Sequence, residues 1–247
     1  YQEAGEDPKA LECIPMLKRS DIKREAAKII NEELTVDDSL FLYHDVCTNG
    51  IGYVDLMFKT DSIAPEQIPY LGLLKSVLGY VDTENYTYGE LFNEINANTG
   101  GINCGVEVFD RADSTEEFQA MFSVRGKALY TKMDFLFKMI GEILNSSKLE
   151  DTKRLYEIVA SVKSRAQVNL TGAGHSTAVL RAAAYSSPMA AFQDEMAGIG
   201  YYQFIEKLEK DFEQRKEETV EELCKLMKKI LRPENFMISY TGERESL

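Results

Sequence analysis

Residues 60–110 read TDSIAPEQIPYLGLLKSVLGYVDTENYTYGELFNEINANTGGINCGVEVFD, and this stretch decides the fold because it orders two helices and a returning strand. From Ile68 to Leu78 the apolar residues recur at three- and four-residue spacing, which predicts a helix with one buried stripe. Thr87 starts a second helix, since a threonine followed by Glu90 three residues later forms a capping box. Two glycines end that helix, and alternating apolar residues after them predict a half-buried strand.

The rest of the chain adds strands on both sides of this stretch and a long helical region after it. Asn49-Gly50 predicts a tight turn, since this pair accepts positive φ at both positions, and the strands beside it are expected to form a hairpin. Segregated strands and helices predict an α+β domain with long helices packed on one face of a sheet. The expected strands are 28–34, 40–44, 51–58, 102–108, 118–129 and 236–240, and the later helices are 130–144, 152–168, 175–197 with a break at Pro188, one from Gly200, and 213–231.

Three further motifs, together with residues 60–110, carry a resemblance to a known family. They are IPMLKRSDI at 14–22, LTGAGHSTAVLRAAA at 170–184 and MAGIGYYQFIEKLEKDF at 196–212. In this order the four stretches resemble the presequence-protease branch of the pitrilysin-like and insulysin-like zinc metallopeptidases, the inverzincins. The match is to the third, zinc-free domain of these proteins.

The resemblance implies an organisation for the whole chain. Residues 1–20 would be the end of a hairpin linker, and residues 21–247 a single domain with a mixed sheet of about six strands. The chain would be a fragment of a four-domain protein that encloses short unstructured peptides in a chamber. Its partners would then be those peptides and the catalytic half of the same protein.

Composition limits the other partners. The 247 residues carry a formal net charge of −13, which argues against nucleic acid as a partner because phosphate binding needs a basic surface. The sequence has no apolar run near the roughly 20 residues that a membrane helix needs, so no membrane partner is expected. The four cysteines are far apart, which favours thiols in a reducing compartment, the bacterial cytoplasm or an organelle matrix. The first residue is Tyr, so the chain is expected to be part of something longer.

A catalytic zinc is not expected in this chain. The active half of the family binds zinc through H-x-x-E-H, in which two imidazoles share one helix face and the glutamate is the general base. The resemblance places the equivalent of that motif on Leu71, Leu74 and Lys75, whose side chains cannot hold Zn²⁺. We therefore expect no catalytic residue, metal site or cofactor here, and zinc only in the full-length parent.

The two histidines and one turn are the remaining candidates. His175 beside Ser176 is not a G-x-S-x-G elbow, so a structural place at a helix start is favoured over catalysis, and its role in the family is not assigned. His44 is expected to be packed or hydrogen-bonded on a strand. The stretch from Thr99 through Gly100 and Gly101 to Ile102 reads as a turn, and the resemblance suggests that these four residues face the chamber.

Three functional hypotheses follow from these patterns. The first is a non-catalytic domain of a zinc metalloendopeptidase, which walls the chamber and docks against the catalytic half while the fragment itself is inactive. The alternative is an inactive relative that acts as a structural or partner-binding subunit. A third, an independent hydrolase using His175 and Ser176, would require activity from the isolated chain.

Overall fold

The computed structural model describes residues 5, 9, 13, 15–22, 24, 25, 28, 30–114 and 116–246. The chain divides into two compact units, Tyr1–Ile30 and Asn31–Leu247. In the first unit, the backbone N–H of Lys18 donates to Asp21 Oδ2 at 2.8 Å and closes a 3-10 turn over Arg19–Asp21. Ile14, the first residue of one family-like motif, and most of the expected linker lie outside the described residues.

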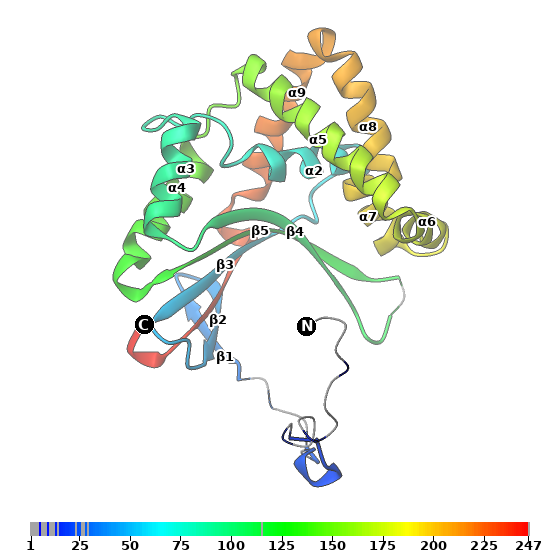
Figure 1. Ribbon diagram of the computed structural model, residues 1–247. Coiled ribbons are helices and arrows are strands. Elements are labelled where there is room, and N and C mark those ends of the chain that lie inside the picture. The colour runs from blue at the N-terminus through cyan, green and yellow to red at the C-terminus, as the bar shows by residue number, and fades with distance from the viewer. Residues whose placement is uncertain are drawn as a thin grey trace. The chain divides into compact units, whose positions relative to one another are not determined.

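The second unit is built on one mixed six-stranded sheet with the order β1-β2-β6-β3-β5-β4. The pair β2–β6 is parallel and the other neighbours are antiparallel. This is the expected fold class, with the helices on one side of the sheet (Figure 1). The strands are β1 (Glu32–Val36), β2 (Ser39–Asp45), β3 (Ile51–Lys59), β4 (Ile102–Asp110), β5 (Phe118–Leu129) and β6 (Phe236–Gly242).

The predicted helices are present, with small shifts at their ends. Thr87 caps α3 through a complete capping box with Glu90, and Asp151 caps α5 by accepting from the backbone N–H of Arg154 at 3.0 Å. Pro188 breaks the helical run as expected, because it is the first residue of a new helix whose cap is Ser187. The helices are α2 (Ile68–Val77), α3 (Tyr88–Asn98), α4 (Met133–Ser146), α5 (Thr152–Gly172), α6 (Gly174–Ala183), α7 (Pro188–Ala197), α8 (Ile199–Lys210) and α9 (Phe212–Ile230).

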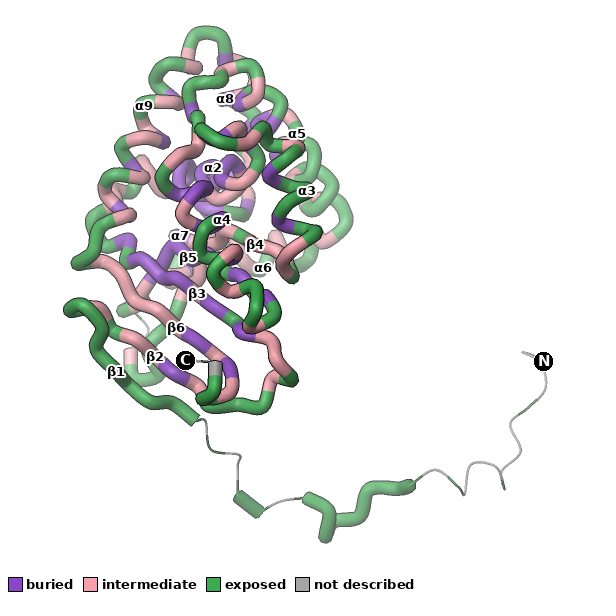
Figure 2. The backbone as a smooth tube through the Cα atoms, turned by 90° about the vertical axis from the view of Figure 1, so that its left-hand side faces the viewer, coloured by how far each residue is buried: buried purple, intermediate pink, exposed green. Residues whose placement is uncertain are grey.

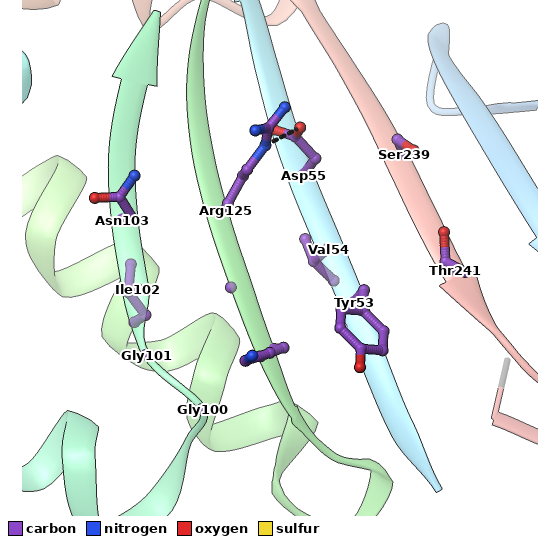
Figure 3. A pocket seen from close by; sticks show the side chains of 12 residues that line it. Tyr53, Val54, Asp55, Gly100, Gly101, Ile102, Asn103, Arg125, Ser239 and Thr241 are labelled. Carbon is purple, nitrogen blue, oxygen red and sulfur yellow. Dashed lines mark hydrogen bonds and ion pairs between the residues drawn. The ribbon is translucent and has the colours of Figure 1, made fainter. Parts of the chain in front are cut away.

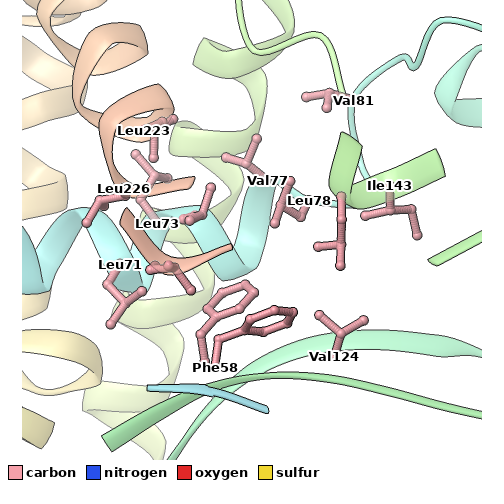
Figure 4. Close-up of a cluster of buried hydrophobic side chains, with 14 of the residues drawn as sticks. Phe58, Leu71, Leu73, Val77, Leu78, Val81, Val124, Ile143, Leu223 and Leu226 are labelled. Carbon is pink, nitrogen blue, oxygen red and sulfur yellow. The ribbon is translucent and has the colours of Figure 1, made fainter. Parts of the chain in front are cut away.

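The core lies between the sheet and the helices, with α2 at its centre. Alternate residues of β3 and β5, such as Phe58 and Val124, point toward α2, and α9 supplies Leu223 and Leu226 from the other side (Figure 4). The backbone of α2 is buried along almost its whole length in Figure 2. Each fully buried leucine stabilises the fold by about 1.5–3 kcal/mol, so α2 anchors the helical layer on the sheet.

The expected hairpin of β2 and β3 is wrong, although its turn is correct. Asn49 and Gly50 both have positive φ, at 54° and 82°, as this turn requires. The two strands that it joins are not paired, because β6 lies between them and bonds to both. Turn chemistry fixes the reversal of the chain but does not exclude the insertion of a third strand from the far end of the sequence.

Glu243, which directly follows β6, holds this turn in place. Its carboxylate accepts from the backbone N–H groups of Thr48 and Asn49, both at 3.1 Å, and from the hydroxyl of Tyr130. Hydrogen bonds to this carboxylate lower the pKa of Glu243 to about 2, and the bond from Tyr130 has the largest effect. The carboxylate is therefore charged in the folded chain at pH values where the unfolded chain has already taken up a proton.

We expect Glu243→Gln to weaken the acid dependence of stability. Because the folded pKa is depressed, the stabilisation is fully present above the unfolded pKa of about 4.3 and is lost as pH falls through about 2. The variant should be less stable than the natural chain at pH 7, and the gap should close toward pH 2. Urea midpoints measured across this range check it, with the exposed Glu66→Gln as the control. A gap that stays constant with pH would contradict the assigned role.

No helix in the described part of the chain is both long enough and apolar enough to cross a membrane.

Candidate functional site

The face of the sheet turned away from the helices carries polar groups beside the buried Met57 and Met121, and this face is the candidate functional surface. Strand alternation sends Val54 and Tyr240 into the core and their neighbours Tyr53, Asp55 and Thr241 to the opposite side. Tyr53 is 42% exposed there. We call this side of the sheet the free face. It presents hydroxyl, carboxylate and guanidinium groups, and core packing does not require any of them.

A hollow of about 520 Å³ lies on the free face between the 100–102 turn and three strands. Figure 3 shows Arg125 and Asp55 side by side on β5 and β3, with Ser239 and Thr241 beyond them on β6. Groups from four segments far apart in sequence meet here because β6 and β5 both pair with β3. The hollow is lined by Tyr53, Val54, Asp55, Gly100, Gly101, Ile102, Asn103, Arg125, Gly126, Lys127, Ser239 and Thr241.

Arg125 is the main charged group of the hollow. Its Nε lies 2.7 Å from Asp55 Oδ2 and its Nη1 lies 3.1 Å from Glu107 Oε1, so one guanidinium bridges β3 and β4. The hydrogen bond that Arg125 donates to Asp55 raises the pKa of Arg125 above its ordinary value. Asp55 Oδ1 is buried and has no hydrogen-bond partner among the described residues. One acceptor is therefore still available to a donor that enters the hollow.

The 99–102 turn has a defined structural role and also contributes to the hollow. Thr99 Oγ1 donates to the carbonyl of Ile95 at 2.7 Å and accepts from the N–H of Gly101 at 3.0 Å. Gly101 has φ of 104°, which favours glycine. A Cβ on Gly100 would lie 2.6 Å from the Lys127 side chain. Gly100, Gly101 and Ile102 line the hollow, whereas Thr99 closes the helix behind it. That these residues face a chamber stays a prediction.

The three residues that the resemblance matches to the zinc motif have side chains that do not suit a metal, and the match itself stays a prediction. Leu71 and Leu74 are 0% and 1% exposed and belong to the core, so their side chains are surrounded by hydrocarbon. Lys75 lies one turn after Leu71 and is half-buried, and its ammonium would repel Zn²⁺. No group of three or more His, Cys, Asp or Glu side chains that could hold a metal ion occurs in the ranges that the structure describes.

Neither histidine belongs to a metal-binding cluster among the described residues. His44 Nε2 lies 3.2 Å from Ser239 Oγ, so His44 is hydrogen-bonded on its strand. His175 is exposed near the start of α6, next to the exposed Ser176. Neither histidine lines the hollow on the free face.

Sequence reasoning missed most of the polar residues of the hollow. Tyr53, Asp55, Arg125, Ser239 and Thr241 lie between the apolar residues that predicted β3, β5 and β6. The alternation that predicted the strands could have assigned these residues to the outer face. It could not have shown that they meet, because the strand order was not available from the sequence.

Comparisons with known proteins identify relatives of the chain. A family model described as peptidase M16C associated matches residues 1–208. Protein HypA of Clostridium perfringens is 37% identical over 95% of this chain and 24% of its own length. Presequence protease 1, chloroplastic/mitochondrial, of Arabidopsis thaliana is 27% identical over 100% of this chain and 23% of its own length. The mitochondrial presequence protease of Saccharomyces cerevisiae is 28% identical over 99% of this chain and 25% of its own length.

The chain thus spans about a quarter of the length of these relatives. A solved structure of a conserved protein from Enterococcus faecalis V583 has a similar fold. The match has a TM-score of 0.57 and 14% identity, and it covers 86% of this chain and 48% of the other. At that identity the likeness concerns the fold alone.

Proposed function

The chain belongs to the peptidase M16C-associated family, in its presequence-protease branch, and on that premise we propose that it is a zinc-free domain of a larger zinc metalloendopeptidase. Its role in that protein is to wall a closed chamber in which short unstructured peptides are degraded. It docks against the catalytic half, which supplies the zinc and the general base. We place the parent protein in a reducing compartment, the bacterial cytoplasm or an organelle matrix.

The free face is the observation that carries this proposal. The helices bury the other side of the sheet, so of the two faces of the described sheet it is the free face that a ligand can reach without disturbing the core. The hollow on it combines an exposed tyrosine, a guanidinium, two hydroxyl groups and an unpartnered carboxylate oxygen. Such a mixture can bind the backbone and side chains of many extended peptides, because no single side-chain shape is selected.

Hydrolysis belongs to the parent and not to this chain. The position of the zinc motif holds Leu71 and Leu74 in the core, and no step of peptide hydrolysis can be assigned to them. The free face binds peptide and helps to exclude folded proteins from the chamber. It holds a peptide by weak contacts, while the enclosed space excludes folded proteins. That division of roles predicts an inactive fragment and an active parent.

The proposal is tested by cleavage of a fluorogenic, unstructured basic peptide, with bound metal measured in parallel. The 247-residue chain should be silent and hold no stoichiometric zinc. The full-length protein should cleave the peptide and lose that activity with a chelator. Silent and metal-free full-length protein would favour the structural or partner-binding subunit instead. Zinc-dependent cleavage by the fragment would overturn the assignment of this domain as non-catalytic.

Within the full-length protein we expect Tyr53→Ala to raise KM for the peptide by about three- to tenfold, with kcat little changed. An aromatic contact is worth about 0.5–1.5 kcal/mol, and its loss weakens binding without touching the chemical step. Tyr80→Ala is the matched control, since Tyr80 is 51% exposed but does not line the hollow. Equal KM values for the two variants would show that the free face does not contact substrate.

A further inference from the structure

A second cavity lies within the helical layer, on the other side of the sheet from the free face. It has a volume of about 250 Å³ and is formed by α2, α5, the start of α6, the end of α7 and α8. This cavity belongs to none of the features used above. It is formed by this chain alone, so an inference from it does not rest on the proposed function.

The charges that line this cavity are positive. The half-buried Lys75 lines it from α2, and the exposed Arg165 lines its rim from α5. None of its lining residues within the described ranges is Asp or Glu, in a chain whose formal net charge is −13. No ion pair within 4.0 Å is found for Lys75 among the described residues. Burial lowers the pKa of Lys75, as expected for an ammonium with little water and no close counterion.

Tyr201 is a second polar group that lines the cavity, independent of the two cations. Its side chain lines the cavity and is 5% exposed, and among the described residues its hydroxyl has no hydrogen bond of good geometry, only a weak interaction with the Ser76 hydroxyl that lowers its pKa slightly against the effect of burial. The hydroxyl of Ser76 lies nearby but donates to the carbonyl of Gly72 at 3.4 Å. Burial raises the pKa of Tyr201, so its hydroxyl stays protonated and can donate. A buried hydroxyl without a good acceptor is unfavourable, and an acceptor that enters the cavity would remove that penalty.

Two carboxylates interact with residues around the cavity without lining it. Asp194, behind Gly198, is already bound to Arg181 at 2.6 Å and to the backbone N–H groups of Ile199 and Gly200. Glu107 raises the pKa of Lys75 through its charge, but its carboxylate pairs with Arg125. Neither of them neutralises the two cations at the cavity.

We propose that this cavity binds a small carboxylate that carries a short apolar group. The carboxylate would lie between Lys75 and Arg165 and accept the hydrogen bond of Tyr201. The apolar group would contact the hydrocarbon side of the cavity, which is formed by Val162, Ala166, Leu170 and Met196. The terminal residue of a peptide and a free acid share this chemistry, and the test below distinguishes them.

The test uses N-acetyl-leucine and its uncharged relative N-acetyl-leucinamide as probes of the 247-residue chain. Binding is followed by calorimetry and by NMR of the ¹³C-labelled methyl group of Met196. We expect the acid to bind at least about tenfold more tightly than the amide, because hydrogen bonds to charged groups are the strong ones. A short peptide ending in leucine, with a free or an amidated C-terminus, tests the peptide as the source. Tighter binding of the free-ended peptide than of the acid would identify a peptide end as the ligand.

Three variants and one control locate the site. Arg165→Gln and Lys75→Gln should each weaken binding of the acid by about tenfold or more, and Tyr201→Phe by about threefold or more. Lys153→Gln, an equal charge change at an exposed residue of α5, should leave it unchanged. Tyr201→Phe should keep or raise the melting temperature without ligand, so loss of binding is not loss of folding. Equal binding of acid and amide, or unchanged binding in Arg165→Gln and Lys75→Gln, would overturn the proposal. If inorganic phosphate bound as tightly as N-acetyl-leucine, the proposed contact of the apolar group with the cavity would be wrong.

Discussion

The triple variant Leu71→His, Leu74→Glu, Lys75→His is expected to unfold the chain rather than give it a zinc site. The substitutions write H-x-x-E-H into α2 at the spacing that zinc peptidases use. Leu71 and Leu74 are 0% and 1% exposed, so their replacements would be placed in the core. Removing a buried leucine costs about 2–5 kcal/mol, and burying an imidazole or a carboxylate adds to that cost. The total is comparable with the whole stability of a domain, about 5–15 kcal/mol.

Zinc cannot recover this loss, because the site would remain incomplete. A catalytic site needs three protein ligands, and the triple variant supplies only two imidazoles, because the glutamate of the motif is the general base and does not bind the metal. Circular dichroism and the loss of a cooperative urea transition measure the outcome, with and without added zinc. Lys75→His alone is the control, since Lys75 is half-buried at the surface of α2, and it should fold. A folded triple variant that binds one zinc would mean that α2 is not the core helix described above.

Leu74 is buried and Lys75 is half-buried, as the apolar spacing of this segment predicts. Features of this kind can be predicted from neighbouring residues alone. The apolar stripe of α2, the capping box of α3 and the alternation of β5 could all be read from the sequence, because each is set by neighbours within four residues. Even the left-handed turn at Asn49-Gly50 follows from local chemistry. The unfitness of α2 for zinc was predictable for the same reason, since it depends on side-chain type and helical spacing.

What could not be predicted depends on contacts between distant segments. The insertion of β6 between β2 and β3 joins residues that are nearly 200 positions apart, for example Tyr43 beside Tyr240. The hollow on the free face exists only because of that pairing. Close contacts between helices could not be predicted from the sequence either. A Cβ on Gly72 would lie 2.6 Å from the carbonyl oxygen of Met196, but the sequence shows only that a glycine stands inside a helix. Strand order and helix approach are properties of the whole fold.

Asp194→Ala is expected to cost about 2–6 kcal/mol of unfolding free energy, because each of two largely buried backbone N–H donors left unpaired costs about 1–3 kcal/mol, while the partly exposed Arg181 regains contact with water. Asp194 is 1% exposed at the end of α7, where its Oδ2 binds Arg181 at 2.6 Å. Its two oxygens also accept from the N–H groups of Ile199 and Gly200, at 3.0 and 3.1 Å, so it closes the first turn of α8. In the variant the N–H groups of Ile199 and Gly200 would have no acceptor, because no other side chain of the described residues accepts from them there.

The same network explains the Gly198-Ile199-Gly200 sequence. A Cβ on Gly198 would lie 2.4 Å from Asp194 Oδ1 and 2.9 Å from its Cα, so the carboxylate can reach the helix end only where side chains are absent. Thermal unfolding should show a fall of roughly 10 °C in Asp194→Ala, given about 2–4 °C per kcal/mol for a domain of this size. Asp151→Ala removes an exposed cap of the same kind and should cost only about 1 kcal/mol. Equal losses in the two variants would mean that burial adds nothing, and Asp194 would then be an ordinary helix cap.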